Sequence, residues 1–167
     1  MSEKRVIVEG LKVNYEGLFK LQDLYLTMEH WMKERGYDKQ EKKNHEQVLK
    51  TGREIFIEFW GWKRLSDYAD VHIKIEFTIK NMKDVNVKKD GVDIAMNQGK
   101  IVISLNGFLY TDYGGQWEGK PLFYFLRMVF DRWIYSVSTA KFQQAVSEEV
   151  EHLYKTLKGH LNMYRYS

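Results

Sequence analysis

The chain has 167 residues, of which 44% are hydrophobic and none is cysteine. Its 26 basic and 23 acidic side chains leave a net charge of +3, an excess too small to indicate nucleic-acid binding by itself. The lack of cysteine excludes disulfides, thiolate metal sites and thiol catalysis. This length favours a single domain, here residues 1–167, with enough apolar material for a core.

The chain is predicted to open with a strand and a helix. In the first strand, residues 6–13, the apolar positions change phase at Gly10, which indicates a bulge. Apolar residues then recur three or four positions apart between 18 and 32, the pattern of an amphipathic helix. Asn14 is suited to cap this helix, and Gly36 is suited to end it in a left-handed conformation.

The middle of the chain predicts antiparallel strands. Residues 41–50 have the polar composition of an edge strand, and residues 53–62 form a strand that is apolar on both faces. Residues 68–80 alternate apolar and polar side chains without a break, which is typical of an antiparallel strand with one buried face. Asp90 and Gly91 separate two apolar runs and have the sequence of a tight hairpin turn.

The register of that hairpin predicts a second bulge. A two-residue turn places Val87 opposite Ile94, but the same register would set Ile101 and the apolar residues after it opposite polar partners. One residue must therefore be absorbed, either at 97–99 or at 81–84. The predicted class is α+β: a curved antiparallel sheet of about six or seven strands packs its apolar face against N-terminal and long C-terminal helices.

The last third of the chain is predicted to be largely helical. After a loop at 111–119, residues 122–135 are apolar nearly all round, as in a helix that is enclosed on several sides. A second helical stripe runs from Phe142 to Leu161. Residues 136–139 are either a bend in one helix or a join between two helices.

This order of elements resembles the helix-grip arrangement of the START and Bet v 1-like superfamily. The resemblance comes from the strand at 6–13, the helix at 18–32, the strands between 48 and 110 and the helix from Pro121, without any shared motif. It implies a cavity between the curved sheet and the last helix that often holds an apolar ligand. The chain departs from the family in having one helix, not two, after the first strand.

Large apolar residues are the candidates for lining such a cavity. The candidate ligand-binding residues are Tyr124, Phe125, Met128, Val129, Trp133, Phe56 and Trp60. The first hypothesis is a non-catalytic intracellular module that holds a small apolar or amphipathic molecule between the sheet and the C-terminal helix. Core packing explains the same residues, and so does a structural protein that forms a homodimer through the helix at 121–135.

An enzyme is a further alternative. Glu54, Glu58 and His72 share the even-numbered face of two neighbouring strands. The pairing of these strands would bring Glu58 near His72 or Lys74, within reach for acid–base catalysis or for a simple cross-strand ion pair. Both interpretations stay open, and no catalytic residue is assigned.

No cofactor or metal is predicted, because the five histidines lack the paired spacing of a helix metal site and no glycine-rich phosphate loop is present. Basic residues near Trp60 and Trp62 come closest to a nucleic-acid surface, but a lysine-rich sheet edge explains them, so nucleic acid is disfavoured as a partner. This basic set comprises Lys39, Lys42, Lys43, Lys50, Arg53, Lys63 and Arg64. The chain has neither a signal-peptide pattern nor an apolar run that would span a bilayer, which favours a cytoplasmic location.

Overall fold

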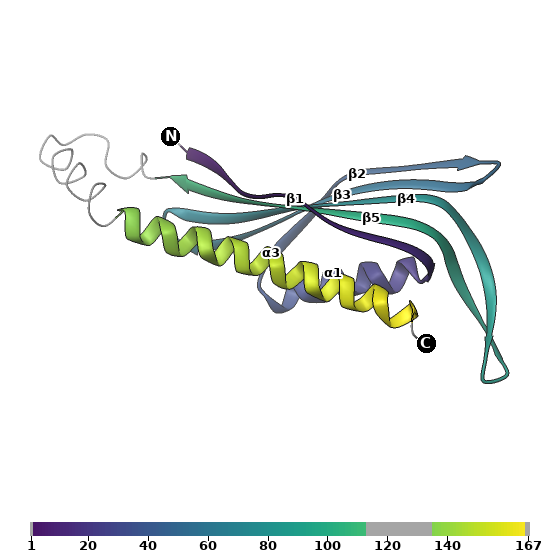
Figure 1. The fold of residues 1–167 in the computed structure, drawn as a ribbon. Coiled ribbons are helices and arrows are strands. Elements are labelled where there is room, and N and C mark those ends of the chain that lie inside the picture. Colours follow the sequence, from purple (N-terminus) through teal and green to yellow (C-terminus); the bar gives the residue numbers. More distant parts are fainter. Residues whose placement is uncertain (1, 113–134, 166–167) are drawn as a thin grey trace, which may run out of the picture.

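The computed structural model describes residues 2–112 and 135–165. The elements are β1 (Ser2–Phe19), α1 (Leu21–Glu34), β2 (Asp38–Leu49), β3 (Gly52–Ser66), β4 (Ala69–Lys89), β5 (Val92–Asp112) and α3 (Tyr135–Arg165). The strands form one antiparallel sheet in the order β1-β5-β4-β3-β2, and both helices lie on the same face of it (Figure 1). This confirms an α+β fold with an antiparallel sheet and a long C-terminal helix. We call the face that carries the helices the inner face, and the opposite one the outer face.

The number of strands differs from the prediction. The described residues form five strands, not six or seven. The difference arises because β4 and β5 each run for 21 residues through the segments that were expected to separate shorter strands. A bulge shifts the pairing there without ending it, so two pairs of predicted segments merge into two long strands.

The predicted hairpin and its bulge are both present. Asp90 and Gly91 form the turn with φ of 54° and 77°, the left-handed values that a tight two-residue turn requires. Val87 lies opposite Ile94, as the turn predicts. The register then shifts between Lys80 and Lys83, which returns the apolar residues of both strands to the inner face. Beyond this shift the hairpin bends toward the side of the sheet that carries the helices (Figure 1).

The bulge predicted in β1 is also confirmed. The pairing of β1 with β5 shifts between Val6 and Leu11, and Gly10 has a left-handed φ of 63°. The backbone N–H of Gly10 donates to the side-chain oxygen of Asn106 at 2.9 Å, so the irregular backbone is hydrogen bonded. The predicted edge strand is β2, which pairs only with β3 among the described strands.

The predicted start of the first helix is wrong. Asn14 does not cap a helix, because residues 14–19 continue β1 and pair with residues 97–102 of β5. The helix begins instead at Leu21, whose backbone N–H donates to the side-chain oxygen of Asn97 at 3.0 Å. Asn97 of the neighbouring strand β5, a residue distant in sequence, therefore supplies the acceptor at the start of this helix. The end of the helix agrees with the prediction, since Gly36 follows it with a φ of 75°.

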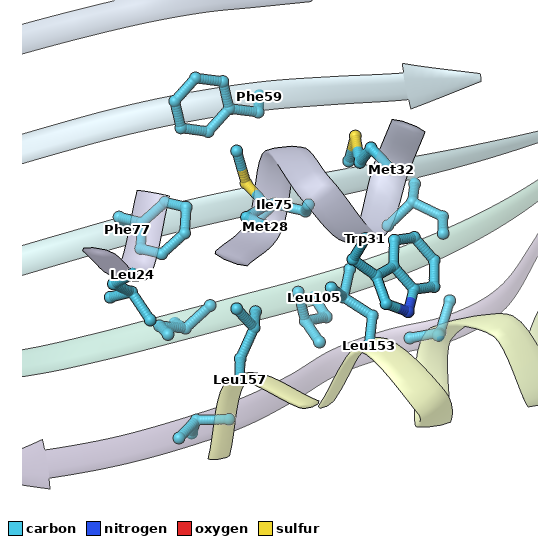
Figure 2. Packing of buried hydrophobic residues seen from close by; sticks show 14 of the residues in the cluster. Leu24, Met28, Trp31, Met32, Phe59, Ile75, Phe77, Leu105, Leu153 and Leu157 are labelled. Carbon is cyan, nitrogen blue, oxygen red and sulfur yellow. The ribbon is translucent and has the colours of Figure 1, made fainter. Parts of the chain in front are cut away.

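The core lies between the inner face of the sheet and the two helices. Figure 2 shows residues of α1 and α3 packed over residues of the strands. The buried residues labelled there are Leu24, Met28, Trp31, Met32, Phe59, Ile75, Phe77, Leu105, Leu153 and Leu157. Contact is closest at Gly107 of β5, where an added Cβ would lie 2.7 Å from a methyl carbon of Val150 on α3. Glycine suits this position because the β-branched side chains of Val150 and Val146 on α3 fill the space that a Cβ would take.

The C-terminal stripe forms as predicted. Val146, Val150, Leu153, Leu157 and Leu161 are all buried along α3. Residues 136–139 lie within this helix. The expected loop at 113–119 and the expected helix up to residue 134 fall outside the described residues.

Candidate functional site

The bulge in β4 shapes the inner face of the sheet near the β4–β5 hairpin. Asn81 adopts a left-handed φ of 56°, and Met82 beside it is 2% exposed and turned toward the inner face. Two glycines lie against this irregular backbone. A Cβ at Gly52 would meet the backbone of Asn81 at 2.8 Å, and one at Gly99 would meet the carbonyl oxygen of Lys80 at 2.9 Å. The strands therefore approach the bulge too closely for any other residue.

A pocket of about 430 Å³ lies between this bent part of the sheet and the first turns of α1. Its size falls within the usual range of small-molecule sites. The apolar residues that line it are Leu21, Ile55, Ile57, Phe77 and Met82. Four of these come from adjacent strands and share the inner face, because the bulge restored the register that groups them.

The polar residues of the pocket come from four different elements. They are Gln22, Tyr25, Asn44, Glu46, Arg53 and Asn97. Asn44 and Glu46 are exposed on the edge strand β2, opposite Ile57 and Ile55 of β3. The pocket thus has an apolar wall formed by the sheet and polar groups toward its exposed side, which suits a molecule with an apolar body and a polar group.

Arg53 is the basic residue of this lining, and two carboxylates hold it. Its Nη2 lies 2.5 Å from Oδ1 of Asp84, and its Nη1 lies 3.4 Å from Oε1 of Glu46. The amide nitrogen of Asn97 donates to the same oxygen of Asp84 at 2.8 Å. Asn97 therefore joins the ion pair to the start of α1, and the polar side of the pocket is one connected network.

A second polar cluster ties α3 to the rest of the molecule. Glu149 of α3 accepts hydrogen bonds from Arg35 at 2.6 Å, Tyr37 at 3.0 Å and Lys63 at 3.4 Å. Burial alone would raise the pKa of Glu149, but the hydrogen bonds from Tyr37 and Arg35 and the charge of Lys63 hold this pKa below its ordinary value. Burial, together with the neighbouring charge of Glu149, raises the pKa of Tyr37. Because each of these partners is engaged, the cluster is an attachment of α3 to the end of α1.

Two of the predicted ligand-binding residues lie on the outer face. Trp60 stacks on Phe108 with ring centroids 5.6 Å apart, and Lys4 lies 4.2 Å from the centroid of Phe108. Phe56 lines a small groove of about 100 Å³ on the same face. Neither residue lines the pocket beside α1, because side chains of even-numbered residues in β3 point away from the helices. The other five, Tyr124, Phe125, Met128, Val129 and Trp133, lie outside the described residues.

The structure does not bring together Glu54, Glu58 and His72, the three residues of the alternative enzyme hypothesis. Glu58 is 8% exposed, accepts a hydrogen bond from Nε1 of Trp60 at 2.7 Å and lies 3.9 Å from Nζ of Lys74. His72 lies opposite Trp62, four residues along β4 from the partner of Glu58, and its ring contacts Tyr110 at 4.3 Å between centroids. Burial lowers the pKa of His72. The expected proximity of Glu58 to Lys74 is present, whereas no contact joins Glu58 or Glu54 to His72 among the described residues.

The basic set considered for nucleic acid is divided between the two faces. Lys39 pairs with Glu29 of α1 on the inner face, and Lys63 reaches Glu149 on the same side. Lys42 instead lies over the ring of Trp60 on the outer face, 5.0 Å from its centroid. These cations do not form one surface.

Within residues 2–112 and 135–165, no group of three acidic, histidine or cysteine side chains is arranged to hold a metal ion. The helices in this part of the chain are too short or too polar to cross a membrane. No protein-family model matches the chain, and no curated protein matches it in sequence.

The position of the pocket could have been anticipated from the order of the residues, although not from the amino-acid composition. Ile55, Ile57 and Phe77 are recognisable as inner-face residues from alternation, and the bulge near 81–84 follows from the hairpin register. Together they indicate where the sheet bends. The role of Asn97 could not be anticipated, because it depends on β1 and β5 meeting beside the start of α1.

Proposed function

We propose that this chain binds a small apolar or amphipathic molecule in the pocket between α1 and the bent part of the sheet. The observation that carries the proposal is the lining of this pocket, in which five apolar side chains from α1, β3 and β4 meet six polar ones. Apolar surface that a ligand covers contributes about 25 cal/mol per Å² before the costs of association are subtracted. The polar groups would fix the orientation of the ligand.

The location of the pocket modifies the hypothesis drawn from the sequence. The pocket is bounded by α1, whereas the expected cavity lay beside the C-terminal helix. The resemblance to the helix-grip arrangement stays a prediction. A homodimer formed through residues 121–135 and a cytoplasmic location stay predictions as well.

Fluorescence titration with the uncharged dye phenylnaphthylamine tests the proposal. The wild-type protein should bind the dye, and Asn44→Trp should weaken binding about tenfold or more, because the indole occupies the apolar space that the dye would cover. Asn44 is exposed on the edge strand β2, so the substitution should leave folding unchanged.

Gln47→Trp is the matched control. It introduces the same side chain on the same strand, but opposite Glu54 on the outer face. This variant should bind the dye as the wild type does. Equal binding by both tryptophan variants, or no binding by the wild type, would contradict the proposal.

A further inference from the structure

The charges around the pocket restrict what its ligand can be. Arg53 is the only basic residue among the described residues that line the pocket, and its guanidinium already lies between Asp84 and Glu46. Lys39, whose Nζ donates to the hydroxyl of the lining residue Tyr25, is itself paired with Glu29, so two positive charges beside the pocket face three negative charges. An anionic head group placed here would compete with the carboxylates of Asp84 and Glu46 for Arg53 and would be repelled by them.

The exposed carboxylate of Asp84 has a second donor at the oxygen that contacts Arg53. Its Oδ1 accepts from both Nη2 of Arg53 and the amide nitrogen of Asn97, and the side-chain oxygen of Asn97 accepts from the backbone N–H of Leu21. Turning Arg53 toward a ligand would break its 2.5 Å contact with Asp84 and leave that carboxylate without its cationic partner. Arg53 is therefore part of the pocket wall rather than a receptor for an anion.

The remaining polar groups of the lining are uncharged. Gln22, Asn44 and Asn97 carry side-chain amides, and Tyr25 carries a hydroxyl that accepts a hydrogen bond from Nζ of Lys39 at 2.8 Å. Amides and hydroxyls can pair with hydroxyl, amide or carbonyl groups of a ligand. We infer, on the basis of the proposed function, that the ligand is an amphipathic molecule with an uncharged, hydrogen-bonding head group. Fatty acids and phosphate-bearing lipids are then excluded as ligands of this pocket.

Two dyes that share one ring system test this inference. Phenylnaphthylamine is uncharged, and anilinonaphthalene sulfonate is the same molecule with an added sulfonate. The wild-type protein should bind the uncharged dye about tenfold more tightly than the sulfonated one, a ratio of the size expected from one uncompensated charge near the pocket. The double variant Glu46→Gln with Asp84→Asn releases Arg53 and should abolish this preference by strengthening binding of the sulfonated dye.

The double variant Glu9→Gln with Asp93→Asn is the control, since it makes the same change in net charge at exposed positions that do not line the pocket. It should keep the wild-type preference. If both dyes bind with equal affinity and Asn44→Trp weakens both, the pocket binds ligands but the inference about charge is wrong. If the preference survives the release of Arg53, the inference is also wrong. If neither dye binds, the proposed function itself fails.

Discussion

The inner face of the sheet has two halves that differ in how they are covered. Under α3, side chains interlock with the sheet so closely that Gly107 has no room for a Cβ beside Val150. Beyond the start of α1, residues of the same apolar character, such as Ile57, line a pocket. Alternation along a strand decides which residues face inward, but only a helix above them determines whether that surface is filled. The same pattern therefore gives a core in one half and a candidate binding site in the other.

The largest contrast is expected between two truncations, one in each half. Leu153→Ala on the buried side of α3 should lower the free energy of unfolding by about 4 kcal/mol, because it leaves a cavity in a closed core. Ile57→Ala in the pocket wall should cost only about 1 to 2 kcal/mol, because the space it leaves joins a pocket that is already open. Urea unfolding of both variants measures this difference. Equal costs would show that the two halves are packed alike.

A pair of glycine substitutions tests the close contact under α3. Gly107→Ala should cost about 2 to 3 kcal/mol, since the new Cβ would lie 2.7 Å and 3.0 Å from methyl carbons of Val150 and Val146. Gly159→Ala serves as the comparison, because nothing outside the adjacent backbone of α3 lies within 4 Å of its Cβ position. That variant should gain up to about 1 kcal/mol from helix propensity. A tolerated Gly107→Ala would mean that α3 does not pack as described.

The attachment of α3 should depend on pH. The pKa of Glu149 is lowered in the folded state, so its stabilising contribution is present above the unfolded pKa and is lost as pH falls through the folded pKa. Glu149→Gln should therefore destabilise the protein by about 2 kcal/mol at neutral pH and by much less at acid pH. Glu151→Gln, which removes only a surface pair with Lys155, should have little effect at either pH. A cost for Glu149→Gln that does not change with pH would contradict this account.

The smallest effect is expected at the cap of α1. Asn97→Ala removes the acceptor for the N–H of Leu21 and should lower the free energy of unfolding by about 1 kcal/mol. Because the lost bond lies at the pocket, hydrogen exchange should accelerate in the first turn of α1 and stay unchanged in α3. Asn86→Ala, at an exposed position further along the β4–β5 hairpin, is the matched control. Uniform acceleration in both helices would show that Asn97 stabilises the fold as a whole.

Much of the sheet could be predicted from the sequence, because local rules determine it. The turn at Asp90 and Gly91 and the shift between Lys80 and Lys83 both follow from side-chain alternation. The start of α1 could not be predicted, since Asn14 lies in a strand that is held by pairing with distant Val102. Local preference for a helix cap is weaker than a continuous ladder of strand hydrogen bonds.

The site was harder to predict than the fold. Side-chain alternation correctly predicts that Trp60 shares a face of the sheet with Glu58. Alternation does not tell which of the two faces the helices cover, because that depends on tertiary packing. Large aromatic side chains suggested a cavity, whereas on the outer face Trp60 stacks on Phe108 beneath Lys42 and Lys4. The apolar lining of the pocket instead consists of Leu21, Ile55, Ile57, Phe77 and Met82, residues that composition alone would assign to the core.

Methyl NMR of the protein during titration with phenylnaphthylamine tests the central claim most directly, because it locates the ligand in one of the two halves. We predict that methyl signals of Ile57, Ile55 and Met82 shift with the dye while those of Val150 and Leu157 on the buried side of α3 stay in place. Shifts confined to the residues under α3, or an unchanged spectrum in the presence of excess dye, would contradict the account.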